Sequence, residues 1–177
     1  MSIWKGIVGE GFTCDEFDEY ISRLEFDLWR PEFVVLHNTQ IPRLDAWHSV
    51  SGEERMRGFE KYYRDEMDWS AGPHLFVADD LIWVLTALTT SGIHSPSWNK
   101  ISWGVEMVGD YDEEPLDPGV YRNTIRALTA MHARLGLDPK SLRFHKEDTR
   151  TTHTFCPGKN VVKSQVLSDL ERGLAKT

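Results

Sequence analysis

The stretch FVVLHNT, residues 33–39, decides the fold of this 177-residue chain. Its opening residues are apolar and rich in β-branched side chains, which is typical of a buried strand. We therefore expect a strand over Phe33–His37. Pro31 lies just before this strand and the polar run NTQIP follows it, and such residues mark the ends of regular elements.

Strand-like and helix-like segments alternate along the chain on both sides of this stretch. Two capping-box patterns and one Asp-Pro pair mark helix starts. We expect helices from Thr13 to about Phe26, from Ser51 to about Glu66, from Pro118 to Gly136 and over the stripe Val162, Val166 and Leu170, and further strands near His74–Ala78, Ile82–Thr86, Ser102–Val108 and Leu142–His145. The alternation predicts an α/β fold, with a central mixed β-sheet flanked by α-helices.

The length fits a single domain. No internal repeat and no Gly/Ser-rich linker divides the chain. We expect residues 1–30 to form an N-terminal arm and helix packed on the domain, and residues 31–177 to form its main body. The glycines at positions 6, 9 and 11 indicate that the arm itself is irregular.

Charge and apolar patterning exclude several classes of protein. The chain has 20 basic and 28 acidic residues and a formal net charge of −8, which argues against general nucleic-acid binding. No run approaches the roughly 18 apolar residues of a membrane span, and the N-terminus lacks the apolar run of a signal peptide. We expect a protein synthesised in the cytoplasm without stable membrane association. Its two cysteines, Cys14 and Cys156, cannot form a disulfide framework.

Residue types that bind zinc lie at predicted strand ends. His37 ends the first strand of the sheet, His145 ends the last one, and Cys156 follows in a polar loop. Neutral imidazole and thiolate are ligands that zinc prefers, and three protein ligands leave a position open, as in catalytic zinc sites. His153 is a competing ligand. The structural alternatives are hydrogen-bonded histidines and an ordinary buried cysteine.

A carboxylate interrupts the apolar strand SWGVEMVG, which spans residues 102–109. Strand alternation places Glu106 on the face opposite Trp103, Val105 and Met107. A buried carboxylate is costly unless it is paired or faces a wet cleft. Beside a metal-bound water, Glu106 would serve as a general base. A structural ion pair with a basic residue is the alternative.

Taken in order, these residues resemble the zinc-dependent N-acetylmuramoyl-L-alanine amidases. That superfamily includes phage lysozyme-type amidases, bacterial anhydro-muropeptide amidases and peptidoglycan recognition proteins. The similarity spans about Phe33 to Val162 and is carried by VLHNT, SAGPHLFVADDLIWVL, GIHSPSWNKISWGVEMVGD and FHKEDTRTTHTFCPGK. It implies the amidase fold, with residues 31–177 as the catalytic domain.

The resemblance implies a zinc centre. His37, His145 and Cys156 match the zinc ligands, for one Zn2+ per chain, and Cys156 takes the third place because Pro-Gly follows it. Glu106 matches the glutamate that activates the attacking water in the anhydro-muropeptide branch.

Other positions of the resemblance concern the substrate. His94 and Asn99 match residues that shape the substrate cleft, and structural roles for both stay open. Thr154 lies where relatives carry Lys or Thr near the transition-state oxyanion. Pro73 departs from the pattern, because phage-type members place a catalytic Tyr there.

The implied activity is hydrolysis of the amide bond between N-acetylmuramic acid and L-alanine in peptidoglycan or muropeptides, as in a phage or prophage endolysin. A muropeptide-recycling enzyme and an exported effector are other roles for the same chemistry. Two alternatives have a different chemistry: a non-catalytic peptidoglycan-binding module, and a cysteine hydrolase that uses Cys156. We expect a monomer.

Overall fold

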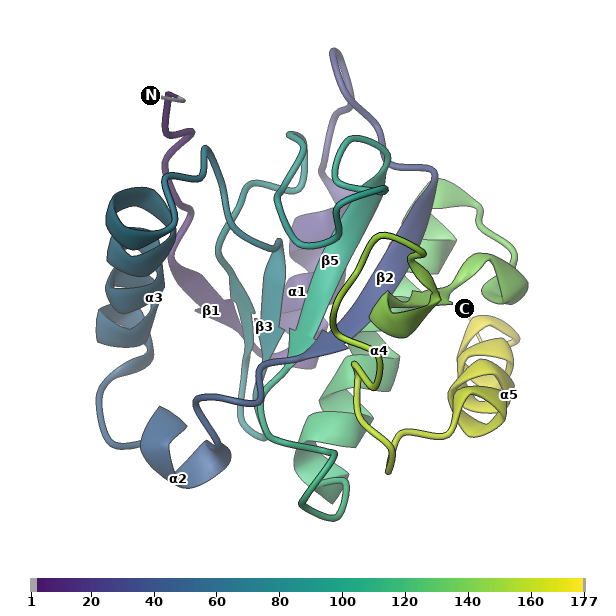
Figure 1. Ribbon diagram of the computed structural model, residues 1–177. Coiled ribbons are helices and arrows are strands. Elements are labelled where there is room, and N and C mark those ends of the chain that lie inside the picture. The colour runs from purple at the N-terminus through teal and green to yellow at the C-terminus, as the bar shows by residue number, and fades with distance from the viewer. Residues whose placement is uncertain (1–2, 177) are drawn as a thin grey trace.

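The computed structural model describes residues 3–176, which form one α/β domain around a six-stranded sheet (Figure 1). In chain order, the elements are β1 (Glu10–Phe12), α1 (Cys14–Ser22), β2 (Phe33–Asn38), α2 (Leu44–Trp47), α3 (Gly52–Lys61), the π-helical turn η1 (Tyr62–Glu66), β3 (Leu75–Val77), β4 (Ile82–Val84), β5 (Ser102–Met107), α4 (Pro118–Leu135), the 3-10 turn η2 (Pro139–Ser141), β6 (Arg143–Phe144), the 3-10 turn η3 (His145–Glu147) and α5 (Lys163–Leu174). The predicted single domain and its mixed sheet are confirmed.

The sheet has the strand order β1-β4-β3-β5-β2-β6. Strands β3, β5, β2 and β6 run parallel to one another, whereas β4 pairs antiparallel with both β3 and β1. The carboxyl ends of the parallel strands therefore meet at one edge of the sheet, and loops that follow these strands converge there.

Helices cover the two faces of the sheet unequally. One face carries the main core, which includes Leu36, Val105 and Leu128, and α1, α4 and α5 pack on this side. On the other face, α2 and α3 cover a second cluster around Phe76 and Trp83 (Figure 1). Beside α3, side chains of β2 and β5 reach a cleft.

The N-terminal arm is more regular than the sequence indicates. Glu10–Phe12 forms the edge strand β1, because the outer edge of β4 offers unpaired backbone groups to it. The helix that follows ends at Ser22, although we expected it to reach about Phe26. The side chain of Arg134 donates hydrogen bonds to the carbonyls of Ile21 and Leu24, which satisfies the end of the helix.

Two further expectations differ in detail, and the short helix α2 was not expected. Helix α3, which we expected to reach about Glu66, ends at Lys61. The chain continues from there to Glu66 as the π-helical turn η1. The short helix α2 has no clear apolar stripe in the sequence. The last strand is only Arg143–Phe144, so His145 directly follows a strand and begins η3. Among the described residues, no helix has the length and apolar character needed to span a membrane.

The longest helix, α4, has a cap that can be tested. The Asp117 carboxylate accepts hydrogen bonds from the backbone N–H groups of Gly119 and Val120, at 2.8 and 2.9 Å. Asp117→Ala should lower the free energy of unfolding by about 1 kcal/mol, because these donors lose their partner. Urea unfolding measures the change. Asp27→Ala, which removes an exposed carboxylate outside any helix, should leave the stability unchanged; equal losses in both variants would contradict the cap.

Candidate metal centre and cleft

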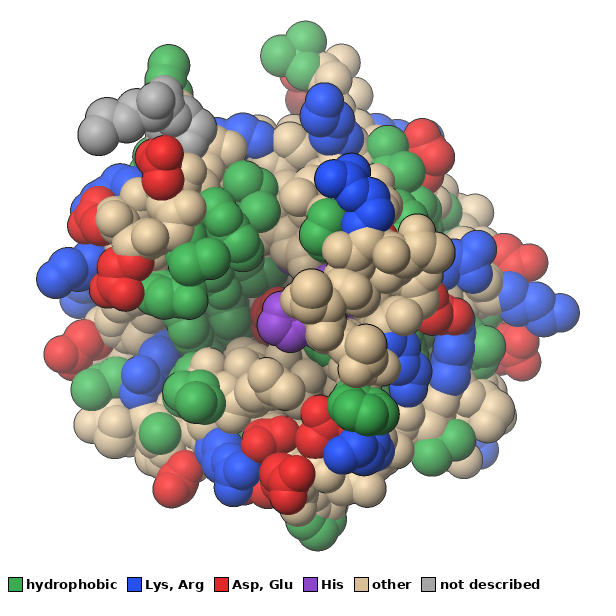
Figure 2. All heavy atoms as spheres, in the orientation of Figure 1, with side chains coloured by type: hydrophobic (Ala, Val, Ile, Leu, Met, Phe, Trp, Pro, Cys, Tyr) green, Lys and Arg blue, Asp and Glu red, His purple; other side chains and the backbone are tan. Residues whose placement is uncertain are grey.

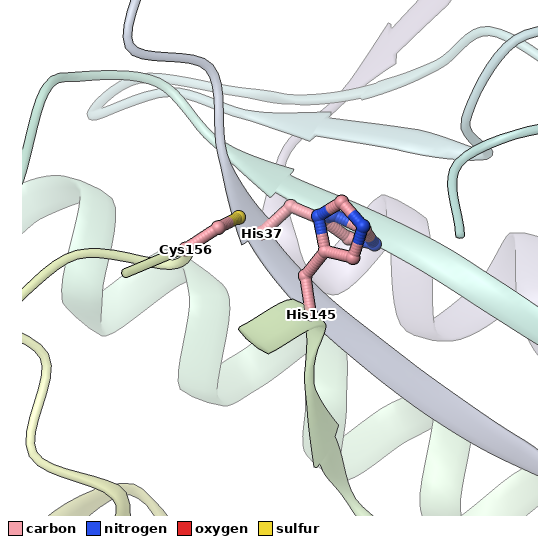
Figure 3. A group of neighbouring side chains, drawn as sticks. All are labelled: His37, His145 and Cys156. Atoms are coloured by element: carbon pink, nitrogen blue, oxygen red, sulfur yellow. The ribbon is translucent and has the colours of Figure 1, made fainter. Parts of the chain in front are cut away.

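Three side chains with metal-binding atoms meet at the carboxyl edge of the sheet (Figure 3). His37 lies near the end of β2, His145 follows its neighbour β6, and Cys156 lies in the loop before α5. Their ligand atoms all lie within 4.8 Å of one another, and all three residues are buried. The backbone N–H of Lys146 donates to the carbonyl of Cys156 at 2.9 Å, which joins the two loop segments.

Hydrogen bonds orient both imidazoles of this group. Nε2 of His37 lies 3.0 Å from Nδ1 of His94, and Nε2 of His145 lies 2.8 Å from the hydroxyl of Thr151. With Nε2 occupied, Nδ1 is the nitrogen available to a metal on each ring. Metal-binding histidines usually have their second nitrogen held by a partner in this way.

Burial determines the protonation of the three groups. It lowers the pKa of His37 well below its usual value and that of His145 to about 4, so both rings are neutral at pH 7. Burial and, second, the charge of Glu106 raise the pKa of the Cys156 thiol. Two neutral imidazoles and a thiol that only a nearby cation would deprotonate fit a zinc ion. They do not fit a free thiolate nucleophile.

Glu106 lies beside this group. In the parallel pairing of β2 with β5 it stands opposite His37, and its Oε1 is 3.8 Å from Nδ1 of His37. Burial raises the pKa of Glu106 to about 8. Within residues 3–176, no Lys or Arg forms an ion pair with this carboxylate, so the alternative of a structural pair with a basic side chain finds no support.

The structure places His94 and Asn99 in one loop with different surroundings. The His94 ring lines the cleft and contacts His37. The Asn99 side-chain oxygen accepts hydrogen bonds from the backbone N–H groups of His94 and Ser95, both at 2.7 Å, and thereby fastens the loop. Contact of either residue with substrate stays a prediction.

Thr154 and His153 lie in the loop before Cys156. Thr154 is exposed and lies outside the cleft-lining residues, so its oxyanion role stays a prediction. The His153 ring stacks on that of His145, with 5.3 Å between the centroids, and lines the cleft. The group of potential metal ligands does not include it.

Sequence reasoning missed two supporting residues. Thr151 holds the ring of His145, and the buried Asp148 accepts hydrogen bonds from the hydroxyls of Ser95 and Ser97 at 2.6 and 2.5 Å. These bonds tie the loop that carries His94 to the segment that carries His145. Polar residues in loops give no sequence signal for such long-range contacts.

The group opens into a cleft of about 970 Å³. Figure 2 shows this hollow, with histidine and acidic atoms at its base next to a large hydrophobic surface. Aromatic residues of α3, η1 and the loop after it form the hydrophobic wall, among them Phe59, Tyr63 and Trp69. The cleft thus combines a polar, potentially metal-binding floor with an aromatic side.

A sequence model of the N-acetylmuramoyl-L-alanine amidases matches residues 28–159. The chain belongs to this amidase family. The match contains the three potential ligands and Glu106, and it begins after α1. Membership links the protein to peptidoglycan, as an amidase or as a binder of the peptidoglycan-recognition type.

Solved structures share the amidase fold. The amidase LysC from Clostridium intestinale URNW is 20% identical, with a TM-score of 0.66 over 81% of this chain and 87% of that one. The endolysin of the Thermus scotoductus MAT2119 bacteriophage Ph2119 is 23% identical, with a TM-score of 0.62 over 82% and 88%. A Drosophila PGRP-LB variant in complex with tracheal cytotoxin is 19% identical, with a TM-score of 0.66 over 83% and 86%. No curated protein matches the sequence.

The packing of His94 on Gly104 gives a test of the candidate metal centre. A Cβ added at Gly104 would overlap the His94 ring, so Gly104→Ala must displace the partner of His37. We expect zinc affinity to fall by about 10- to 100-fold, as when other supporting partners of metal ligands are lost. Titration against a chelator measures this. Gly58→Ala is the matched control, because a Cβ there meets open space; an unchanged affinity in Gly104→Ala would show that the His94 contact does not support the site.

Proposed function

We propose that the protein is a zinc-dependent hydrolase that cleaves the amide bond between N-acetylmuramic acid and L-alanine in peptidoglycan or muropeptides. The observation that carries the proposal is the convergence of His37, His145 and Cys156, with their ligand atoms within 4.8 Å of one another and Glu106 beside them. Membership in the amidase family supports the assignment of this amide bond as the one that is cleaved.

In this proposal, Nδ1 of each histidine and the sulfur of Cys156 would hold one Zn2+. When bound, the ion would supply positive charge that polarises a carbonyl group and lowers the pKa of a nearby water. His94 and Thr151 hold the two rings in place through their Nε2 atoms. The buried position of all three ligands excludes bulk water from the side of the sheet.

Glu106 moves the proton. Its carboxylate takes a proton from the attacking water and later delivers it to the nitrogen of the leaving L-alanine. Burial that raises its pKa to about 8 makes it a stronger base than an exposed glutamate, and a neighbouring cation favours the ionised form from which it acts.

The solved structures with the same fold suggest a biological role for this activity. The Ph2119 protein is an endolysin, and the PGRP-LB variant binds tracheal cytotoxin. We extend the proposal to a bacteriolytic endolysin role, in which a monomer made in the cytoplasm acts on the cell wall after release.

A peptidoglycan-binding module without catalysis is the second candidate, and the PGRP neighbours favour it. A binder has no need of a metal or of Glu106. The presence of all three potential ligands and of the buried carboxylate favours hydrolysis.

Metal content tests the first part of the proposal. Protein purified without chelator should contain about one zinc ion per chain, and Cys156→Ser should contain much less, because a hydroxyl is a poor substitute for thiolate. Elemental analysis measures both. Chelator should abolish hydrolysis and added zinc should restore it. If the wild-type protein contains no zinc and does not bind added zinc, the zinc-amidase proposal is wrong. Hydrolysis that is sensitive to alkylation but not to chelator would indicate a cysteine hydrolase.

Loss of the Glu106 carboxylate tests the second part. Glu106→Ala should retain zinc but lose hydrolysis by about 10²- to 10⁴-fold, the usual contribution of a general acid–base group. Release of L-alanine-linked peptide from muropeptide, followed chromatographically, gives the rate. Glu113→Ala, which removes a carboxylate outside the cleft, is the matched control and should keep wild-type turnover. Full turnover by Glu106→Ala would remove Glu106 from the mechanism.

A further inference from the structure

Tyr63 lies at the centre of the aromatic wall of the cleft. Its ring stacks on Trp69, with 5.2 Å between centroids and 6° between planes, and on Phe59, at 6.1 Å and 23°. Gly72 lies against the ring as well, because a Cβ at that position would come within 2.8 Å of its Cδ2 atom. Neighbours on several sides therefore fix the position of the ring.

The backbone that carries Tyr63 is a π-helical turn. In η1 the N–H of Met67 donates to the carbonyl of Tyr62 at 3.1 Å, a wider ring than in an α-helix. Such a turn changes the direction in which the following side chains point, and π-turns are frequent at functional sites. Here it occurs where α3 borders the cleft, so Tyr63 is presented by an irregular backbone beside Glu106 rather than by a regular helix.

The Tyr63 hydroxyl has no hydrogen-bond partner within residues 3–176, although the residue lines the cleft. By contrast, the hydroxyl of the fully buried Tyr111 donates to the carbonyl of Val108 at 2.7 Å. Burial and then the charge of Glu106 raise the pKa of Tyr63 well above 10, so it remains a neutral donor. A fixed donor with no internal acceptor is suited to an acceptor on a ligand.

We propose that Tyr63 is a substrate-positioning residue whose hydroxyl donates a hydrogen bond to an acceptor oxygen of the sugar–peptide ligand. The identity of that ligand rests on the proposed function. The aromatic wall then contributes in two ways. Its ring faces make apolar contacts with the ligand, and the Tyr63 hydroxyl fixes the orientation of the ligand relative to Glu106.

Removal of the hydroxyl alone tests this role. Tyr63→Phe keeps the ring stack, so zinc content and the midpoint of thermal unfolding should match the wild type. We expect KM for a muropeptide to rise about 3- to 10-fold with kcat within about twofold, because a hydrogen bond kept from the bound substrate to the transition state contributes to binding alone. Tyr20→Phe is the matched control, since Tyr20 lies outside the cleft and packs on Phe12; its KM should equal that of the wild type.

A second measurement does not depend on turnover. In the Glu106→Ala background, Kd for the same muropeptide, measured by calorimetry, should rise by the same factor when Tyr63→Phe is added. Unchanged KM and Kd would overturn the proposal, and so would a loss that is accompanied by loss of zinc or of thermal stability. If the zinc-loaded wild type binds muropeptide without cleaving it, the proposed hydrolysis is wrong, while the Kd comparison still decides the role of Tyr63.

Discussion

The parallel pairing of β2 with β5 is the constraint on which the site depends. It places His37 directly opposite Glu106, on the face of the sheet that reaches the cleft. Their neighbours Leu36 and Val105 point to the other face and lie in the main core. A slip of one residue in either strand would turn its polar side chain into that core and its apolar side chains toward the cleft, at a high cost in free energy. The hydrophobic alternation of the two strands therefore places a potential metal ligand, His37, beside a carboxylate, Glu106.

The segments that follow the strands carry the other residues of the site, and buried hydrogen bonds hold these segments in place. His94 connects its loop to β2 through His37, and Asp148 connects the same loop to the segment after β6. Each of these groups is buried, so an unmade bond would leave a polar atom without a partner in a site of low dielectric constant. Such a network restricts the positions that the segments carrying His94 and His145 can adopt, and it consists of protein groups alone.

The parts of the fold and of the candidate site that could be predicted are those with a local pattern in the sequence. The β-branched run before His37 and the apolar run around Glu106 predict strands, and the structure brings both residues together with His145 and Cys156. The resemblance to the amidases assigned the ligand set; spacing along the chain alone left His153 as a competitor. The edge strand β1, the partner role of Thr151 and the π-helical presentation of Tyr63 could not be predicted. Each depends on contacts between distant segments, for which a single sequence has no periodic signal.

The electrostatics of the site favour metal-dependent over thiol-dependent chemistry. Without a cation, burial holds both histidines neutral and raises the pKa of both Cys156 and Glu106, so each group avoids a charge. A thiol nucleophile needs the opposite environment, one that lowers the pKa of the thiol. A divalent cation among the same atoms reverses the balance, because it favours thiolate and carboxylate at once and is itself stabilised by them in a medium of low dielectric constant. A bound divalent cation would thus favour loss of a proton from Cys156 and from Glu106, while the two imidazoles would stay neutral.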